Sequence, residues 1–169
     1  MPWNLALRID LSSRRATVRL GTRLGQSARR GDLLVLSGDL GAGKTFLARS
    51  IARAFGVGRD QRVTSPTFTL VHQYPGRIPL VHADLYRVGD AFGLVELGLQ
   101  ELRTNGCVLI VEWGEPFVQE LGGDALIIEL QLAARGRTAL LRPSGARSAE
   151  WLSDLAQLQA PVRNGRKPE

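Results

Sequence analysis

The stretch DLLVLSGDLGAGKTFLARSIARAFG, Asp32–Gly56, decides the fold class, because a strand, a glycine-rich loop and a helix follow one another directly. Aliphatic residues fill the segment before the loop, which is typical of a strand buried in a sheet. Apolar residues at helical spacing follow the loop, and Gly56 ends the helix. This order predicts an α/β fold with a binding loop at the end of a strand.

Gly38 is followed, after four residues, by Gly43, Lys44 and Thr45, which is the pattern of a phosphate-binding loop. Glycines let backbone N–H groups approach phosphate oxygens, and the helix directs its positive end at the same anions. Lys44 is one of only two lysines in an arginine-rich chain. A compact ammonium fits such a loop better than a planar guanidinium does. We expect nucleotide contacts from Gly38, Asp39, Leu40, Gly41, Ala42, Gly43, Lys44, Thr45 and Phe46.

Two acidic residues stand at the ends of apolar strands and complete the predicted catalytic set. The segment CVLIVE delivers Glu112, and the segment IPLVHAD delivers Asp84. Glu112 and the Thr45 hydroxyl are the predicted ligands of Mg²⁺, a cation that prefers oxygen ligands. Asp84 is predicted to order the attacking water or the metal shell, and Lys44 to hold phosphate. For either acid, an ordinary strand-end or capping role is the alternative.

Thr64, Ser65 and Thr67 follow the loop's helix, where other NTPases sense the γ-phosphate, and we predict a switch there. Simple turn chemistry is the alternative for these hydroxyls. His72 and His82 lack a third metal ligand and are interpreted as structural. With lysine only at positions 44 and 167, the Asn-Lys-x-Asp signature of guanine readers is absent, so ATP is the expected nucleotide.

Elsewhere, strand and helix patterns alternate without an internal repeat or a linker. Strands are expected at 5–11, 67–74, 78–86 and 107–114 and in a late antiparallel pair, 124–134 and 137–142; helices at 12–29, 90–106 (broken near 98) and 147–159. The predicted architecture is a P-loop NTPase-like, three-layer α/β fold with a mixed, partly parallel central sheet. We expect one domain, 1–160, and a flexible basic tail, 161–169.

The 169 residues carry a net charge of +6 and a single cysteine, Cys107. One cysteine excludes an internal disulfide framework and fits a reducing compartment. No apolar run has the roughly 20 residues that a membrane helix needs, and the N-terminus does not resemble a signal peptide. We therefore predict a cytoplasmic protein that binds no membrane. The positive charge indicates either nucleic-acid contact or arginine used as the solvating charge.

Five ordered motifs, LSGDLGAGKT, TSPTFTLV, HADLYR, ELGL and IVEWGE, resemble the TsaE family of small bacterial P-loop ATPases. The resemblance covers about Leu5–Arg142 and implies a role in tRNA threonylcarbamoyladenosine synthesis. It implies that the chain hydrolyses ATP together with TsaB and TsaD and meets tRNA indirectly through that complex. Hydrolysis would reset the complex between turnovers. No arginine finger can be identified in the sequence, and Arg87 is a candidate only because it follows Asp84 and Tyr86. We therefore expect slow hydrolysis by the chain alone and acceleration by the partners.

The resemblance also implies residue roles that the patterns above leave open. It places Thr17 and Arg137 near the nucleotide, places Trp113 by the nucleotide or the partner surface, and makes 64–67 the switch. Phe46 departs from the family, which commonly has a second threonine after the loop, and His72 stands where asparagine is frequent. Neither departure touches a predicted phosphate or metal ligand.

Two other classes of function remain as alternatives. A small-molecule P-loop kinase would have the same loop and fold, although the sequence offers no clear lid insertion rich in arginine. A nucleic-acid-binding module with a degenerate nucleotide site would explain the net charge. The complete set of Lys44, Thr45 and Glu112 argues against degeneracy.

Overall fold

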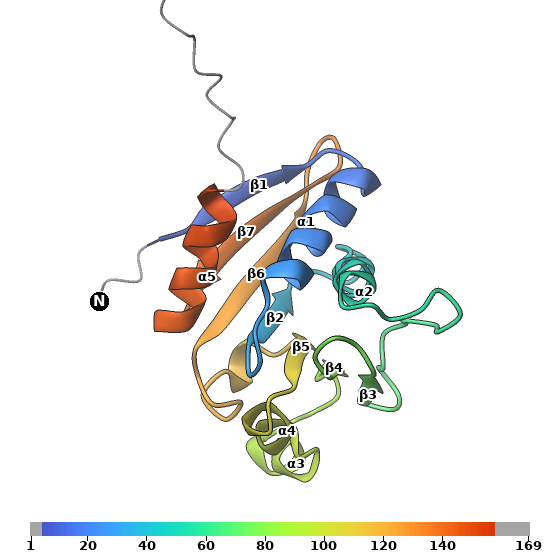
Figure 1. Ribbon diagram of the computed structural model, residues 1–169, viewed down its shortest axis with the longest axis vertical. Helices are drawn as coiled ribbons and strands as arrows, with labels where there is room; N and C mark the ends of the chain where they lie inside the picture. The colour runs from blue at the N-terminus through green and yellow to red at the C-terminus, as the bar shows by residue number, and fades with distance from the viewer. Residues whose placement is uncertain (1–4, 158–169) are drawn as a thin grey trace, which may run out of the picture.

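A computed structural model describes residues 5–157 of the chain (Figure 1). The elements are β1 (Leu7–Leu11), α1 (Arg14–Ser27), β2 (Leu33–Ser37), α2 (Lys44–Ala54), β3 (Val71–Tyr74), β4 (Leu80–Asp84), α3 (Ala91–Glu96), α4 (Leu99–Thr104), β5 (Val108–Glu112), the 3₁₀ turn η1 (Glu115–Phe117), β6 (Ala125–Leu132), β7 (Arg137–Pro143) and α5 (Ala146–Gln157). The predicted basic tail, 161–169, lies outside the described residues. Across the described part, none of the helices has the length and apolar character needed to span a membrane.

The strands form one seven-stranded sheet in the order β1-β7-β6-β2-β5-β4-β3. The central strand β2 is parallel to both β5 and β6, and β4 is parallel to β5. The outer pairs β3–β4, β6–β7 and β1–β7 are antiparallel. The predicted mixed, partly parallel sheet is therefore confirmed, and the carboxyl ends of β2, β4 and β5 meet at one edge.

Helices cover both faces of the sheet. This is required because successive apolar side chains of β2 point to opposite faces. Leu34 and Leu36 belong to the core that α1, α2 and α5 cover, whereas Leu33 and Val35 belong to the core that α3 and α4 cover. All five residues of β2 are buried, and so are all residues of β4 and β5. Buried parallel strands of this kind read as continuous apolar runs, which explains why the sequence revealed them.

Close packing of α1 on α2 fixes the direction of the helix that follows the loop. Gly21 and Gly25 lie one turn apart on α1, and a Cβ at Gly21 would lie 2.5 Å from the Cβ of Ser50. A Cβ at Gly25 would lie 2.6 Å from the Cβ of Ala54. Because the two glycines lack side chains, α2 can pack directly against the backbone of α1.

Predicted and observed helices agree closely. The side chain of Ser13 caps α1 by accepting a hydrogen bond from the N–H of Ala16 at 3.2 Å. The helical segment 90–106 is broken at Gly98, which has a φ of +62°.

One strand prediction, 67–74, was too long, because β3 begins only at Val71. The preceding residues form a turn in which the N–H of Leu70 donates to the carbonyl of Pro66 at 2.6 Å. Leu70 has a φ of +64°, which a strand cannot accommodate. The hydroxyl of Thr67 in this turn donates to Asp84 at 2.9 Å, so a tertiary contact overrides the local strand propensity.

Candidate functional site

The loop between β2 and α2 has a shape that only glycine permits at two positions. Gly38 has a φ of +121°, and a Cβ there would overlap the carbonyl oxygen of Leu130 on β6. Gly43 has a φ of +111° at the N-cap of α2, and a Cβ there would lie 3.2 Å from Nε of Arg137. The first N–H groups of α2 have no partner inside the helix and face this loop. Together they form a cradle suited to an anion.

Lys44 reaches back across this cradle. Its side chain is only 5% exposed, and Nζ donates to the carbonyls of Gly38 at 2.6 Å and Asp39 at 2.9 Å. Nζ also lies 4.1 Å from the centroid of the Trp113 ring. Burial lowers the pKa of Lys44 from its ordinary value, while the negative charges of Glu112 and Asp39, among others, oppose that change. A cation is thus held inside the loop at the position where phosphate would bind.

Thr45, the next residue, contacts the acid at the end of β5. Its hydroxyl lies 2.9 Å from Oε1 and 3.1 Å from Oε2 of Glu112. The carboxylate of Glu112 is 3% exposed, and Nε2 of His82 lies 2.9 Å from its Oε1. Residues 5–157 contain no cluster of three or more His, Cys, Asp or Glu side chains that could hold a metal by themselves. A hydroxyl beside one carboxylate nevertheless fits Mg²⁺, which takes few protein ligands and completes its shell with phosphate and water.

Asp84 stands directly beside Glu112, because β4 and β5 pair Asp84 with Glu112 in parallel register. Its Oδ2 accepts hydrogen bonds from Ser65 at 2.5 Å and Thr67 at 2.9 Å, and its Oδ1 accepts one from the N–H of Tyr86 at 3.0 Å. Two of the three predicted switch residues therefore contact the predicted catalytic acid.

Thr64 lies apart from this group and lines a different pocket, which Arg49, Arg53, Arg59 and Arg62 also line. Both predicted acids, the switch hydroxyls of Ser65 and Thr67, and most of the predicted phosphate loop share one cavity of about 360 Å³, whereas Gly38, Asp39 and Ala42 of that loop do not line it. Its lining comprises Leu40, Gly41, Gly43, Lys44, Thr45, Phe46, Ser65, Thr67, Asp84, Tyr86, Glu112 and Trp113.

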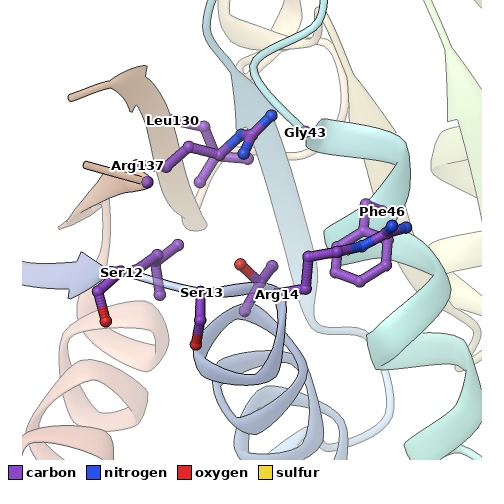
Figure 2. Close-up of a pocket in the computed structure, with 10 residues that line it drawn as sticks. Ser12, Ser13, Arg14, Gly43, Phe46, Leu130 and Arg137 are labelled. Carbon is purple, nitrogen blue, oxygen red and sulfur yellow. The ribbon is translucent and has the colours of Figure 1, made fainter. Parts of the chain in front are cut away.

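A second cavity of about 430 Å³ adjoins the first, because Gly43 and Phe46 line both (Figure 2). Its other lining residues are Leu11, Ser12, Ser13, Arg14, Thr17, Leu130, Gly136 and Arg137. The guanidinium of Arg14 lies 4.8 Å from the centroid of the Phe46 ring and makes one wall. On the other side, Arg137 donates from Nε to the carbonyl of Ala42 at 2.6 Å, which ties β7 to the loop.

The family model described as "Threonylcarbamoyl adenosine biosynthesis protein TsaE" matches residues 11–139, which is most of the chain. The chain belongs to the TsaE family. The "tRNA threonylcarbamoyladenosine biosynthesis protein TsaE" of Treponema pallidum (strain Nichols) is 38% identical over 120 residues, which cover 71% of this chain and 87% of that protein. The protein of the same name from Streptomyces coelicolor is 42% identical over 123 residues, covering 71% of this chain and 81% of that protein.

Among solved structures, the chain is similar to the crystal structure of YdiB from Bacillus subtilis, with a TM-score of 0.74 and 28% identity. The match covers 91% of this chain and 95% of the YdiB chain. The family resemblance inferred from the five motifs is thus confirmed. The matches support the TsaE interpretation and lend no support to the kinase alternative.

His82 and Tyr86 belong to the candidate site although the sequence analysis did not assign them to it. His82 contacts Glu112, and Tyr86 packs on Trp113 with ring centroids 5.1 Å apart. The available signal for His82 was its place two residues before Asp84 on the same strand, because alternate residues of a strand share a face. His72, by contrast, contacts Thr69 and Tyr74 rather than the site.

Proposed function

We propose that this TsaE-family chain is the ATP-hydrolysing subunit that acts with TsaB and TsaD to modify the adenosine next to the tRNA anticodon. Its hydrolysis resets the partner complex between turnovers, and tRNA is met through that complex in the cytoplasm. One observation carries the proposal: the loop lysine, the Thr45–Glu112 pair and Asp84 converge on one cavity at the carboxyl ends of β2, β5 and β4. Ligands of open α/β sheets bind at such ends.

ATP spans the two adjoining cavities. The triphosphate occupies the loop cavity, where Lys44 exchanges its contacts with the carbonyls of Gly38 and Asp39 for phosphate oxygens. The adenosine occupies the larger cavity, between Thr17 and Arg137. Gly43 and Phe46 lie where the two meet, which is the place for the link between sugar and phosphates.

Mg²⁺ would be held by the hydroxyl of Thr45 and by Glu112, directly or through water. It would supply positive charge there to offset the negative charge of the phosphate groups. The chain's own contribution is to hold these two ligands close together, since the Thr45 hydroxyl oxygen lies 2.9 Å from Oε1 of Glu112. Such preorganisation avoids the cost of ordering the ligands during turnover.

Asp84 orients the attacking water, and Ser65 and Thr67 form the switch that controls it. Both hydroxyls and the N–H of Tyr86 already bond this carboxylate. A carboxylate engaged by three donors has little capacity left to order water. We infer that the switch segment must move before Asp84 acts, and that hydrolysis by the chain alone is slow.

An arginine near the γ-phosphate would accelerate transfer by about 10³–10⁵-fold. Among the described residues that line the phosphate cavity, none is an arginine. Arg87, a candidate because it follows Asp84 and Tyr86 in the sequence, instead has its guanidinium 4.9 Å from the centroid of the Phe68 ring. This arrangement supports activation by the partners, which either supply the missing charge or move the switch.

Association with the partners tests the proposal. Immobilised TsaB–TsaD should retain the chain with ATP and Mg²⁺ and release it without nucleotide, and Lys44→Ala should bind equally poorly in both conditions. Released ADP and inorganic phosphate in equal amounts are expected. Phosphate transfer to a nucleoside or another small molecule, together with no binding to TsaB–TsaD, would favour the kinase alternative instead.

A further inference from the structure

His82 occupies a position in the sheet where an apolar residue would be expected. It lies in the middle of β4, is 1% exposed, and pairs across to Ile110 of β5. Its strand neighbour on the same face, Leu80, belongs to the core together with Ile110. Burying an imidazole among such residues is unfavourable unless its nitrogens are hydrogen-bonded.

Only one nitrogen of His82 has a partner within residues 5–157. Nε2 lies 2.9 Å from Oε1 of Glu112, whereas Nδ1 is buried without a hydrogen bond. An ionised carboxylate can only accept, so Nε2 is the donor. An apolar side chain would avoid the cost of the unpaired nitrogen. The contact with Glu112 is therefore the feature that explains a histidine here, and departures from local rules of this kind concentrate at functional sites.

The hydrogen bond from Nε2–H of His82 restricts rotation of the Glu112 carboxylate about its terminal torsion. The terminal torsion of a glutamate is broad and roughly two-fold, so an unrestrained carboxylate can exchange its two oxygens. Thr45 does not distinguish them strongly, since its hydroxyl lies 2.9 Å from Oε1 and 3.1 Å from Oε2. His82 contacts Oε1 alone, and this contact fixes the plane of the carboxylate.

We propose that His82 is a positioning residue for the magnesium site: its Nε2–H holds Oε1 of Glu112, so that the carboxylate meets the metal in one orientation. The inference rests on the proposed function of Thr45 and Glu112 as metal ligands. Partners that hydrogen-bond a ligating group typically change metal affinity or activity by 10–100-fold when they are removed. His82 acts through Glu112 and touches neither ATP nor the metal.

Binding of a non-hydrolysable ATP analogue, measured by calorimetry with Mg²⁺ and again with EDTA, tests this role. His82→Leu should weaken binding in Mg²⁺ by about 10–100-fold and leave binding in EDTA at the wild-type level. His82→Gln can donate from nearly the position of Nε2 and should restore most of the Mg²⁺-dependent gain. His82→Asn carries the same amide on a shorter side chain, cannot reach Oε1, and should behave as His82→Leu does.

The Gln and Asn variants keep the test decisive if His82→Leu fails to fold. The proposed role would be overturned if Mg²⁺ increased the affinity for the analogue equally in His82→Gln, His82→Asn and wild type. It would also be overturned if the two variants lost this Mg²⁺-dependent affinity to the same extent. A loss in EDTA as large as the loss in Mg²⁺ would show general damage to the cavity and would also overturn it. If Mg²⁺ does not increase the affinity of the wild-type chain, the proposed metal site itself is refuted. This outcome can be distinguished from one in which only the proposed role of His82 is wrong.

Discussion

Gly38→Ala should destabilise the protein more than Gly41→Ala, although both glycines lie in the same loop with positive φ values of +121° and +81°. Holding alanine in the left-handed region costs roughly 1–2 kcal/mol, and both variants bear a cost of that kind. A Cβ at Gly41 would meet no heavy atom within 4 Å. Gly41→Ala therefore isolates the backbone cost and serves as the matched control.

At Gly38 the new methyl group would meet the backbone of Leu130. The Cβ would lie 3.1 Å from the carbonyl carbon, 3.3 Å from the amide nitrogen and closer still to the carbonyl oxygen. Favourable contacts need about 3.5–4.0 Å between carbon atoms. Leu130 belongs to β6, which is paired on both sides by β2 and β7 and cannot move freely. Overpacking of this kind adds about 1–3 kcal/mol, so we expect a total of roughly 2–5 kcal/mol.

Urea denaturation followed by circular dichroism would measure both free energies of unfolding. For a chain of this size each kcal/mol corresponds to about 2–4 °C in Tm, so Gly38→Ala should melt at least about 2 °C below Gly41→Ala. Nucleotide affinity should also fall more in Gly38→Ala, because the loop can no longer approach β6. Equal stability of the two variants would refute the argument that contact with Leu130 fixes the loop.

Three further predictions concern other parts of the molecule. Arg147→Met should lower the free energy of unfolding by about 2–3 kcal/mol, measured in urea, because Asp32, a 3% exposed carboxylate bound by that guanidinium at 2.8 Å, keeps among the described residues only the hydrogen bond from the N–H of Arg29. Burial by itself would raise the pKa of Asp124, but hydrogen bonds from Ser148 and further favourable contacts bring it below its ordinary value of 3.8. The ionised carboxylate therefore stabilises the folded protein above pH 3.8, and this contribution is lost as the pH falls through the lowered pKa of Asp124 in the folded state. The difference in Tm between wild type and Asp124→Asn should accordingly become smaller when thermal unfolding is measured at acidic pH. Trp113 fluorescence should change when ATP draws the loop ammonium from its ring, and Trp113→Phe should abolish that change; an unchanged signal in wild type would contradict the proposed triphosphate position.

The sequence predicted best where the physics is local. The segment from β2 to α2 followed from an apolar run, a glycine pattern and helical periodicity, and Glu112 followed from its place at the end of an aliphatic run, where it is the last residue of β5. These features depend on residues next to one another in the chain. Propensity and spacing were sufficient for them.

The prediction failed or stayed silent where a tertiary contact decides. The turn at 67–70 reads as a strand by composition, yet Thr67 is drawn to Asp84, a residue from the next strand. His82 could be assigned to Glu112 only through the parallel register of β4 with β5, which a single sequence does not specify. The position of β2 between β5 and β6 is equally non-local, since it brings together segments far apart in the chain.

Steady-state ATP hydrolysis, with and without TsaB–TsaD, tests the central claim most directly. We expect slow turnover by the chain alone, marked stimulation by the partners, and loss of the stimulated rate in Lys44→Ala and Glu112→Ala. Glu115→Ala is the matched control, because this nearby carboxylate is exposed and, within residues 5–157, forms an ion pair with Arg142 alone, at 3.2 Å. It should keep the wild-type rate. An ATP hydrolysis rate that TsaB–TsaD does not change, or that stays at the wild-type level in Lys44→Ala, would contradict the proposed function.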